Sequence, residues 1–67
     1  MPNGEFESVY HKIQQIKNST TRKQPIPIDA ISNELAINRE LVMQYVTAMH
    51  ILDMIQDYDR DAELVIA

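Results

Sequence analysis

The stretch that decides the fold is Leu35-Ala36-Ile37-Asn38-Arg39-Glu40-Leu41-Val42. Asn38 stands between two apolar segments, and asparagine is strongly favoured at the position before a helix. Its side-chain oxygen accepts a hydrogen bond from a backbone N–H of the first turn that has no partner within the helix. We therefore expect one helix to begin at Arg39 and another to end near Ala36, with a tight turn between them.

Apolar residues on both sides of this turn recur at the spacing of a helix face. They predict a short helix over about 28–36 and a longer one over about 39–52. Pro27 and Asp29 suit the start of the short helix, because proline is tolerated there and a carboxylate complements the helix dipole. The residues expected to face the core are Ile28, Ile31 and Leu35 in the short helix and Leu41, Val42, Tyr45, Val46, Met49 and Leu52 in the long one.

Further elements flank this pair of helices. Apolar residues at helical spacing from Phe6 to Ile16 predict a helix over about 5–18, followed by a polar loop. Ile26 alternates with two prolines, so a strand there can pair only at the edge of a sheet. Two β-prone runs separated by turn-forming residues predict a hairpin over about 54–66. We expect its last run, 64–67, to form a sheet edge.

This order of elements resembles the winged helix-turn-helix family. The resemblance covers about residues 6–66, and the segments that carry it are Pro25–Ile31, Leu35–Val42 and Leu52–Ile55. It implies an α+β, mainly α fold in a single domain, residues 1–67, with three helices and a C-terminal β-hairpin wing. The family often has Gly where this chain has Ala36. Because a left-handed conformation costs alanine about 1 kcal/mol, we expect this turn to differ in form.

Charge is distributed unevenly along the 67 residues, which carry a net charge of −4. Residues 1–51 hold five bases and five acids, whereas residues 52–67 hold five acids and Arg60 alone. The whole acidic excess therefore lies on the predicted hairpin. The chain has no cysteine, and so no disulfide that could stabilise its small core.

Several functional classes find no support in the sequence. It lacks a glycine-rich phosphate loop, a nucleophile motif and histidines at metal-ligand spacing, so we expect no enzyme and no cofactor. The acids Asp57, Asp59, Asp61 and Glu63 alternate like the start of a calcium loop, but Ala62 stands where that loop needs glycine, so we expect no metal site. The longest uncharged run, 41–52, has twelve residues, too few to span a bilayer. We expect a soluble, cytoplasmic protein without a membrane partner.

The resemblance implies DNA binding of the transcription-regulator type, with the helix over 39–52 in the major groove. That is the first hypothesis, because DNA binding is the commonest use of the family. The candidate contacts to duplex DNA are Asn38, Arg39, Gln44 and Thr47 at this helix and Lys17, Arg22 and Lys23 around the polar loop. The acidic hairpin would be repelled by phosphates, so we expect no DNA contact from it beyond Arg60.

The alternative hypothesis is a winged-helix module that binds another protein and not nucleic acid. Two apolar residues lie on the predicted exposed face of the 39–52 helix, beside an acidic hairpin. The candidate contacts are Met43, Ile51, Asp57, Asp59 and Asp61. A homodimer is also expected, through the apolar edge strand 64–67 or through the helix over 5–18, because such edges tend to be covered.

Overall fold

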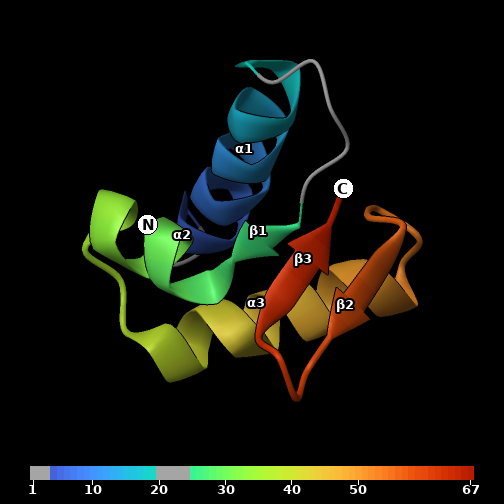
Figure 1. The fold of residues 1–67 in the computed structure, drawn as a ribbon. Helices are drawn as coiled ribbons and strands as arrows, with labels where there is room; N and C mark the ends of the chain where they lie inside the picture. The colour runs from blue at the N-terminus through green and yellow to red at the C-terminus, as the bar shows by residue number, and fades with distance from the viewer. Residues whose placement is uncertain (1–3, 20–24) are drawn as a thin grey trace.

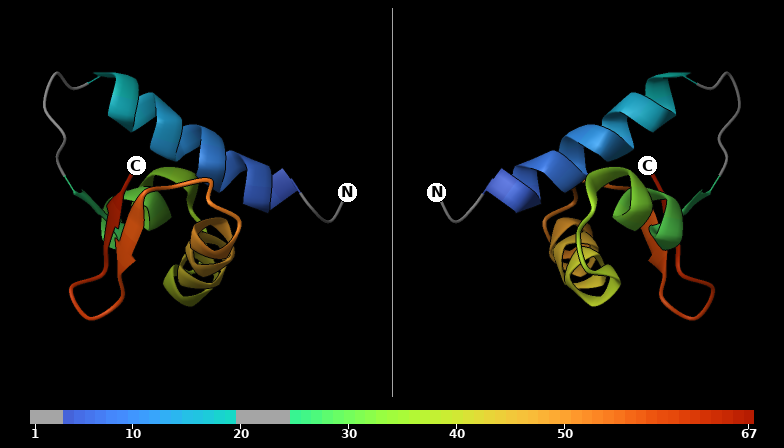
Figure 2. Two further views of the ribbon diagram at one scale, coloured as in Figure 1. Left: turned by 90° about the vertical axis from the view of Figure 1, so that its right-hand side faces the viewer. Right: turned by 90° about the vertical axis from the view of Figure 1, so that its left-hand side faces the viewer.

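In the computed structural model, which describes residues 4–19 and 25–67, the chain forms three helices and a three-stranded antiparallel sheet. In chain order the elements are α1 (Gly4–Ser19), β1 (Ile26–Pro27), α2 (Ile28–Leu35), α3 (Arg39–Ile51), β2 (Asp57–Asp59) and β3 (Leu64–Ile66). Figures 1 and 2 show the sheet beside α3 and α1 crossing α3 at a steep angle. This is the predicted α+β, mainly helical layout of winged-helix type, and the helix bounds agree with the prediction to within one residue.

The core takes residues from every helix and from the sheet. Its buried members are Val9, Ile13, Ile26, Ile28, Ile31, Val42, Val46, Met49, Ile55 and Val65. Leu35 and Tyr45 pack against this cluster as predicted, but the prediction for Leu52 is wrong, because its side chain is 63% exposed. α3 ends at Ile51, so Leu52 is the C-cap and no longer follows the helical stripe that faces the core.

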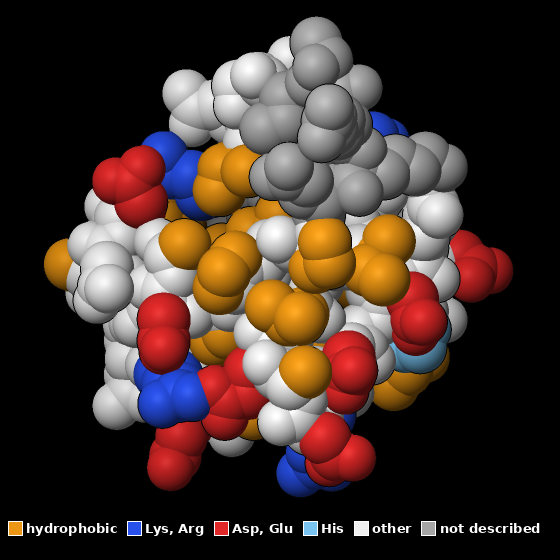
Figure 3. Space-filling view, viewed as in Figure 1, with side chains coloured by type: hydrophobic (Ala, Val, Ile, Leu, Met, Phe, Trp, Pro, Cys, Tyr) orange, Lys and Arg blue, Asp and Glu red, His pale blue; other side chains and the backbone are white. Residues whose placement is uncertain are grey.

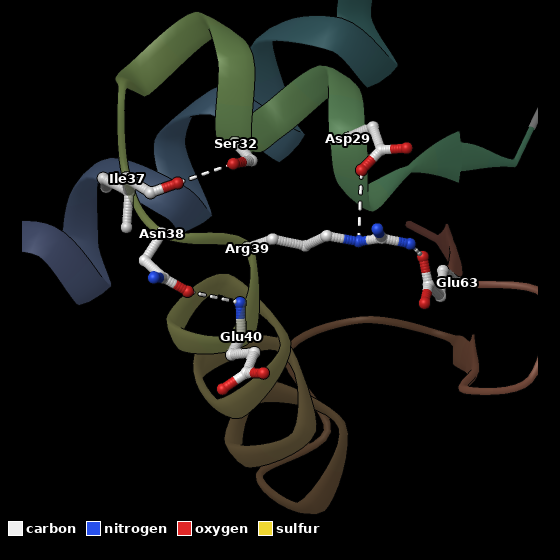
Figure 4. Close-up of polar contacts among 7 residues, drawn as sticks. All are labelled: Asp29, Ser32, Ile37, Asn38, Arg39, Glu40 and Glu63. Atoms are coloured by element: carbon white, nitrogen blue, oxygen red, sulfur yellow. Dashed lines mark hydrogen bonds and ion pairs between the residues drawn. The ribbon is translucent and has the colours of Figure 1, made fainter.

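The turn between α2 and α3 is fixed by a side-chain cap, a left-handed residue and a side-chain hydrogen bond. The side-chain oxygen of Asn38 accepts a hydrogen bond from the backbone N–H of Glu40 at 2.8 Å, which confirms the predicted N-cap (Figure 4). Ala36 adopts the left-handed conformation, with φ 54° and ψ 41°. The expectation that alanine would change this turn is therefore wrong. The Ser32 hydroxyl donates to the Ile37 carbonyl at 2.6 Å and holds the turn closed.

The hairpin begins three residues later than predicted. After α3 the chain first folds back, and the Met54 N–H donates to the Met49 carbonyl at 2.8 Å. Asp53, in the same turn, has a positive φ of 60°. These constraints hold residues 54 and 55 away from β3, and only at Gln56, whose N–H donates to the Ile66 carbonyl at 2.9 Å, does the chain reach it, so β2 starts at Asp57.

The sheet order β1-β3-β2 corrects a second expectation. β3, the strand nearest the end of this chain, is the central strand and not an edge, because β1 pairs with it on one side and β2 on the other. Both outer strands resist further pairing. Pro27 has no N–H to donate, and the N–H of Tyr58 donates to its neighbour's carboxylate, Asp57 Oδ1, at 2.8 Å. The homodimer through residues 64–67 was predicted because an apolar edge strand tends to be covered, and this reason does not apply to a central strand.

The left-handed residue at the turn gives a stability prediction. Replacing Ala36 with Gly removes the steric cost of a positive φ, so we expect Ala36→Gly to raise the free energy of unfolding by up to about 1 kcal/mol. The matched control is Ala30→Gly inside α2, where glycine should lower it by about 1 kcal/mol. Thermal unfolding followed by circular dichroism measures both changes. A loss of stability in both variants would contradict the assigned backbone conformation.

Candidate functional site

An open groove with a volume of about 670 Å³ runs between α3 and the hairpin. Its α3 side is formed by Arg39, Glu40, Met43, Gln44 and Thr47, and its hairpin side by Tyr58, Arg60 and Glu63. The groove brings together three residues predicted for DNA contact, Arg39, Gln44 and Thr47, with Met43 from the alternative hypothesis. The groove therefore contains candidate contacts of both the DNA-binding and the protein-binding hypothesis.

Arg39, the first residue of α3, lies between two carboxylates (Figure 4). Its Nε is 3.1 Å from Asp29 Oδ1 in the first turn of α2, and its terminal nitrogen pairs with the carboxylate of Glu63. The three side chains are 48%, 64% and 31% exposed, so the pairs add at most about 1 kcal/mol each to stability. The pairs matter more for the local charge, because two carboxylates lie beside Arg39, the one lysine or arginine of α3.

The position of Glu63 is fixed by its backbone as well as by its side chain. Its carbonyl accepts a hydrogen bond from the N–H of Ile28 at 2.9 Å, which ties the start of β3 to the start of α2. Glu63 also has a positive φ of 56°. The carboxylate is thus held beside Arg39 by the fold. Because Asp29, Arg39 and Glu63 are far apart in the sequence, no local pattern could have indicated this contact.

The other predicted DNA contacts on α3 differ in what they can offer. The side-chain oxygen of Asn38 is used as the N-cap, and the Thr47 hydroxyl donates to the Met43 carbonyl at 2.8 Å within the helix. Gln44 is exposed on the groove, and its amide can both donate and accept hydrogen bonds. Of the predicted set, Gln44 is the residue best placed to contact a partner.

Of the three predicted phosphate contacts, Lys17 does not join this surface. Lys17 lies in the last turn of α1, which does not line the groove. Arg22 and Lys23 lie outside the described residues, so their positions relative to α3 are not assigned. Over residues 4–19 and 25–67 there are ten acids against four bases, Lys12, Lys17, Arg39 and Arg60.

The residues predicted for protein contact are spread over more than one surface. Met43 lines the groove, whereas Ile51 lies at the end of α3, 77% exposed and outside the groove lining. Asp57 and Asp59 are exposed, and both also organise the hairpin. Asp57 Oδ1 lies 3.6 Å from His50 Nε2, and Asp59 Oδ1 accepts the N–H groups of Asp61 and Ala62 at 3.1 Å. Part of the acidic hairpin is therefore structural.

Tyr58 is a groove residue that sequence reasoning missed. Its hydroxyl oxygen is buried and has no hydrogen-bond partner within the part of the chain that the structure describes. Burial raises the pKa of this hydroxyl above its usual value, although the positive charge of Arg60 acts in the opposite direction. Its position in the predicted hairpin was visible in the sequence, but its register opposite buried Val65, which puts both side chains on the same face of the sheet, comes only from the structure.

Comparisons with protein-family models, with curated proteins and with solved structures found no match to this chain. Within the described ranges, no group of three or more histidine, aspartate or glutamate side chains could hold a metal ion. No helix in the same ranges is long and apolar enough to cross a membrane.

The unpaired hydroxyl gives a second stability prediction. We expect Tyr58→Phe to keep or raise the free energy of unfolding, by up to about 1 kcal/mol, because a buried hydroxyl without a partner is destabilising. The control is Tyr45→Phe, which loses the 2.9 Å hydrogen bond from Tyr45 Oη to Glu5 Oε1 and should lower stability. Denaturant unfolding of both variants measures the difference. A Tyr58→Phe variant less stable than Tyr45→Phe would show that the Tyr58 hydroxyl has a partner.

Proposed function

We propose that this chain is a protein-binding module that contacts its partner through the groove between α3 and the hairpin. The observation that carries the proposal is the pairing of Arg39 with Asp29 and Glu63. A helix that reads the major groove needs bases free to reach phosphates or base edges. In this chain the base at the start of α3 is already neutralised by the fold.

The surroundings of the groove add to this argument. Glu40 and Glu63 line it, and the hairpin that forms its other wall carries three more exposed acids, Asp57, Asp59 and Asp61. Duplex DNA is bound largely by neutralising its phosphates, and these carboxylates would repel it instead. The same carboxylates are compatible with a protein surface that carries basic residues.

The groove also has the chemistry of a protein contact. Met43 and Tyr58 give it an adaptable apolar side chain and an aromatic ring, two residue types enriched in interfaces. Gln44 and Thr47 supply polar groups at its rim. A site of this size buries little area, so we expect a transient interaction with less than about 1,200 Å² in total.

DNA binding through the same face is the second candidate. It is favoured by the exposed amide of Gln44 and by Arg60 on the opposite wall of the groove, for which no acid partner is seen among the described residues. The fold resemblance implies it as well.

A cytoplasmic location stays a prediction from the sequence.

The test uses a photo-crosslinking amino acid in the full chain, in the cells that produce it. We expect protein adducts when it replaces Gln44 and none when it replaces Gln15, an exposed residue on α1 outside the groove. The purified chain should leave labelled duplex DNA unbound even at low salt, where phosphate contacts are strongest.

Two outcomes would contradict the protein-binding proposal or its assignment to the groove. Retardation of duplex DNA at low salt, together with DNA adducts at Gln44, would overturn the protein-binding proposal. In that case Arg39→Ala should relax sequence preference, while Lys23→Ala should weaken binding to all sequences about equally. Equal protein adducts at Gln44 and Gln15 would show that the groove is not the contact surface.

A further inference from the structure

The sheet has one face covered by helices and one face without a partner element in the described part of the chain. On the covered face, Val65 of the central strand lies opposite Ile26 and Tyr58, and Val65 and Ile26 are buried. Because neighbouring residues along a strand point to opposite faces, Leu64 and Ile66 point away from the core. Their register partners Pro27, Asp57 and Asp59 lie on the same outer face.

This outer face is apolar in its middle. Leu64 and Ile66 are only partly buried, and neither packs against the core cluster, while Pro25 and Pro27 beside them are exposed. Figure 3 shows hydrophobic side chains gathered over the sheet, with acidic side chains on both sides of them. A sheet usually buries its apolar faces against other elements, so this face indicates a missing contact.

The sheet edges limit what can make that contact. β1 contains Pro27 and is preceded by Pro25, and the N–H of Tyr58 in β2 donates to the Asp57 carboxylate. An added strand would find few free backbone donors at either edge. A partner must therefore lie across the face and use side chains, which is how a helix covers a sheet.

The dimensions of the face suit one short helix. Neighbouring strands are about 4.8 Å apart, so the three strands span about 10 Å between the outer two, close to the diameter of a helix at about 10 Å. The strands are two to three residues long, which corresponds to about 7–10 Å at roughly 3.3 Å per residue. That length is covered by about two turns of helix.

The charges beside the apolar strip specify the helix further. Asp57 and Asp59 on β2 are exposed along one side of it. From the apolar strip, the blocked edges and these carboxylates, we infer that the outer face of the sheet binds an amphipathic helix of a partner protein. Its apolar stripe covers Leu64 and Ile66, and its lysine or arginine residues face Asp57 and Asp59.

A second copy of this chain fits the face less well. The described residues carry six more acids than bases, ten against four, and two such copies would repel each other at close range. α1 in particular has Glu5 and Glu7 in its first turn. A basic helix has the complementary charge. The inferred surface is the outer face of the sheet, whereas the groove of the proposed function is lined by Tyr58 on the opposite face. The two surfaces can therefore be tested separately.

The experiment titrates the isotope-labelled full chain with two synthetic 14-residue peptides. Both carry leucines at the spacing of one helix face; one has lysines beside the leucines and the other has glutamates. We expect the lysine peptide to bind with a dissociation constant of about 10–500 µM, as suits a small contact, and to shift the amide signals of Leu64 and Ile66. The glutamate peptide should bind at least tenfold more weakly.

Variants of the chain assign the contact. Leu64→Thr with Ile66→Thr places β-branched side chains, which suit a strand, at both positions and should weaken binding of the lysine peptide at least tenfold. Asp57→Asn with Asp59→Asn keeps the side-chain oxygens that accept backbone N–H groups, and should weaken it about threefold to tenfold while reducing its salt dependence. Ile51→Thr, an exposed apolar residue elsewhere, is the control and should change nothing.

Three results would overturn the inference. One is equal binding of the lysine and glutamate peptides. Another is shifts confined to Gln44, Thr47 and their neighbours in the groove, which would leave the proposed function standing and remove this surface. The third is a concentration-dependent shift of Leu64 and Ile66 without peptide, with a dimer in light scattering, which would make a second copy the occupant. The spectra of folded variants exclude unfolding as the cause of lost binding.

Discussion

The ion pairs of Arg39 with Asp29 and Glu63 are the interaction on which the functional account depends. They join the starts of α2, α3 and β3, three segments that meet only in the folded chain. As exposed pairs they contribute little to stability. Their consequence is electrostatic, because two carboxylates lie against the base at the start of α3. The proposed protein-binding role rests on this arrangement, since a helix that reads DNA needs bases free to reach phosphates.

The hairpin then determines which surfaces remain for a partner. β3 lies in the centre of the sheet, β1 contains Pro27, and the Tyr58 N–H of β2 donates to Asp57, so the edges of the sheet offer few free backbone donors to a further strand. What it leaves open are two side-chain surfaces, the groove toward α3 and the outer face with Leu64 and Ile66. Both are bordered by carboxylates. Under the proposed protein-binding role, the acidic excess at the end of the sequence favours a partner surface that carries basic residues.

Local patterns predicted most of the fold and less of the site. Helix bounds followed from apolar spacing and from the Asn38 cap, because these depend on neighbours within a few residues. The central position of β3 could not be predicted, since it depends on pairing with Ile26 and Pro27 nearly 40 residues away. Leu52 fitted the helical stripe, but the helix ends one residue earlier. The pairing of Arg39 required three distant segments to meet, and single-sequence patterns carry no such information.

The state of the Arg39 side chain in solution tests the central claim most directly. The Nε–H signals of Arg39 and Arg60 can be compared in nitrogen-15 NMR spectra of the full chain, with Arg39→Lys and Arg60→Lys to assign them among its three arginines. The account predicts that the Arg39 Nε–H exchanges with water more slowly than that of Arg60, and that Asp29→Asn and Glu63→Gln together remove the difference. Equal exchange of the two arginines in the unsubstituted chain would contradict it, because Arg39 would then be free to bind phosphate.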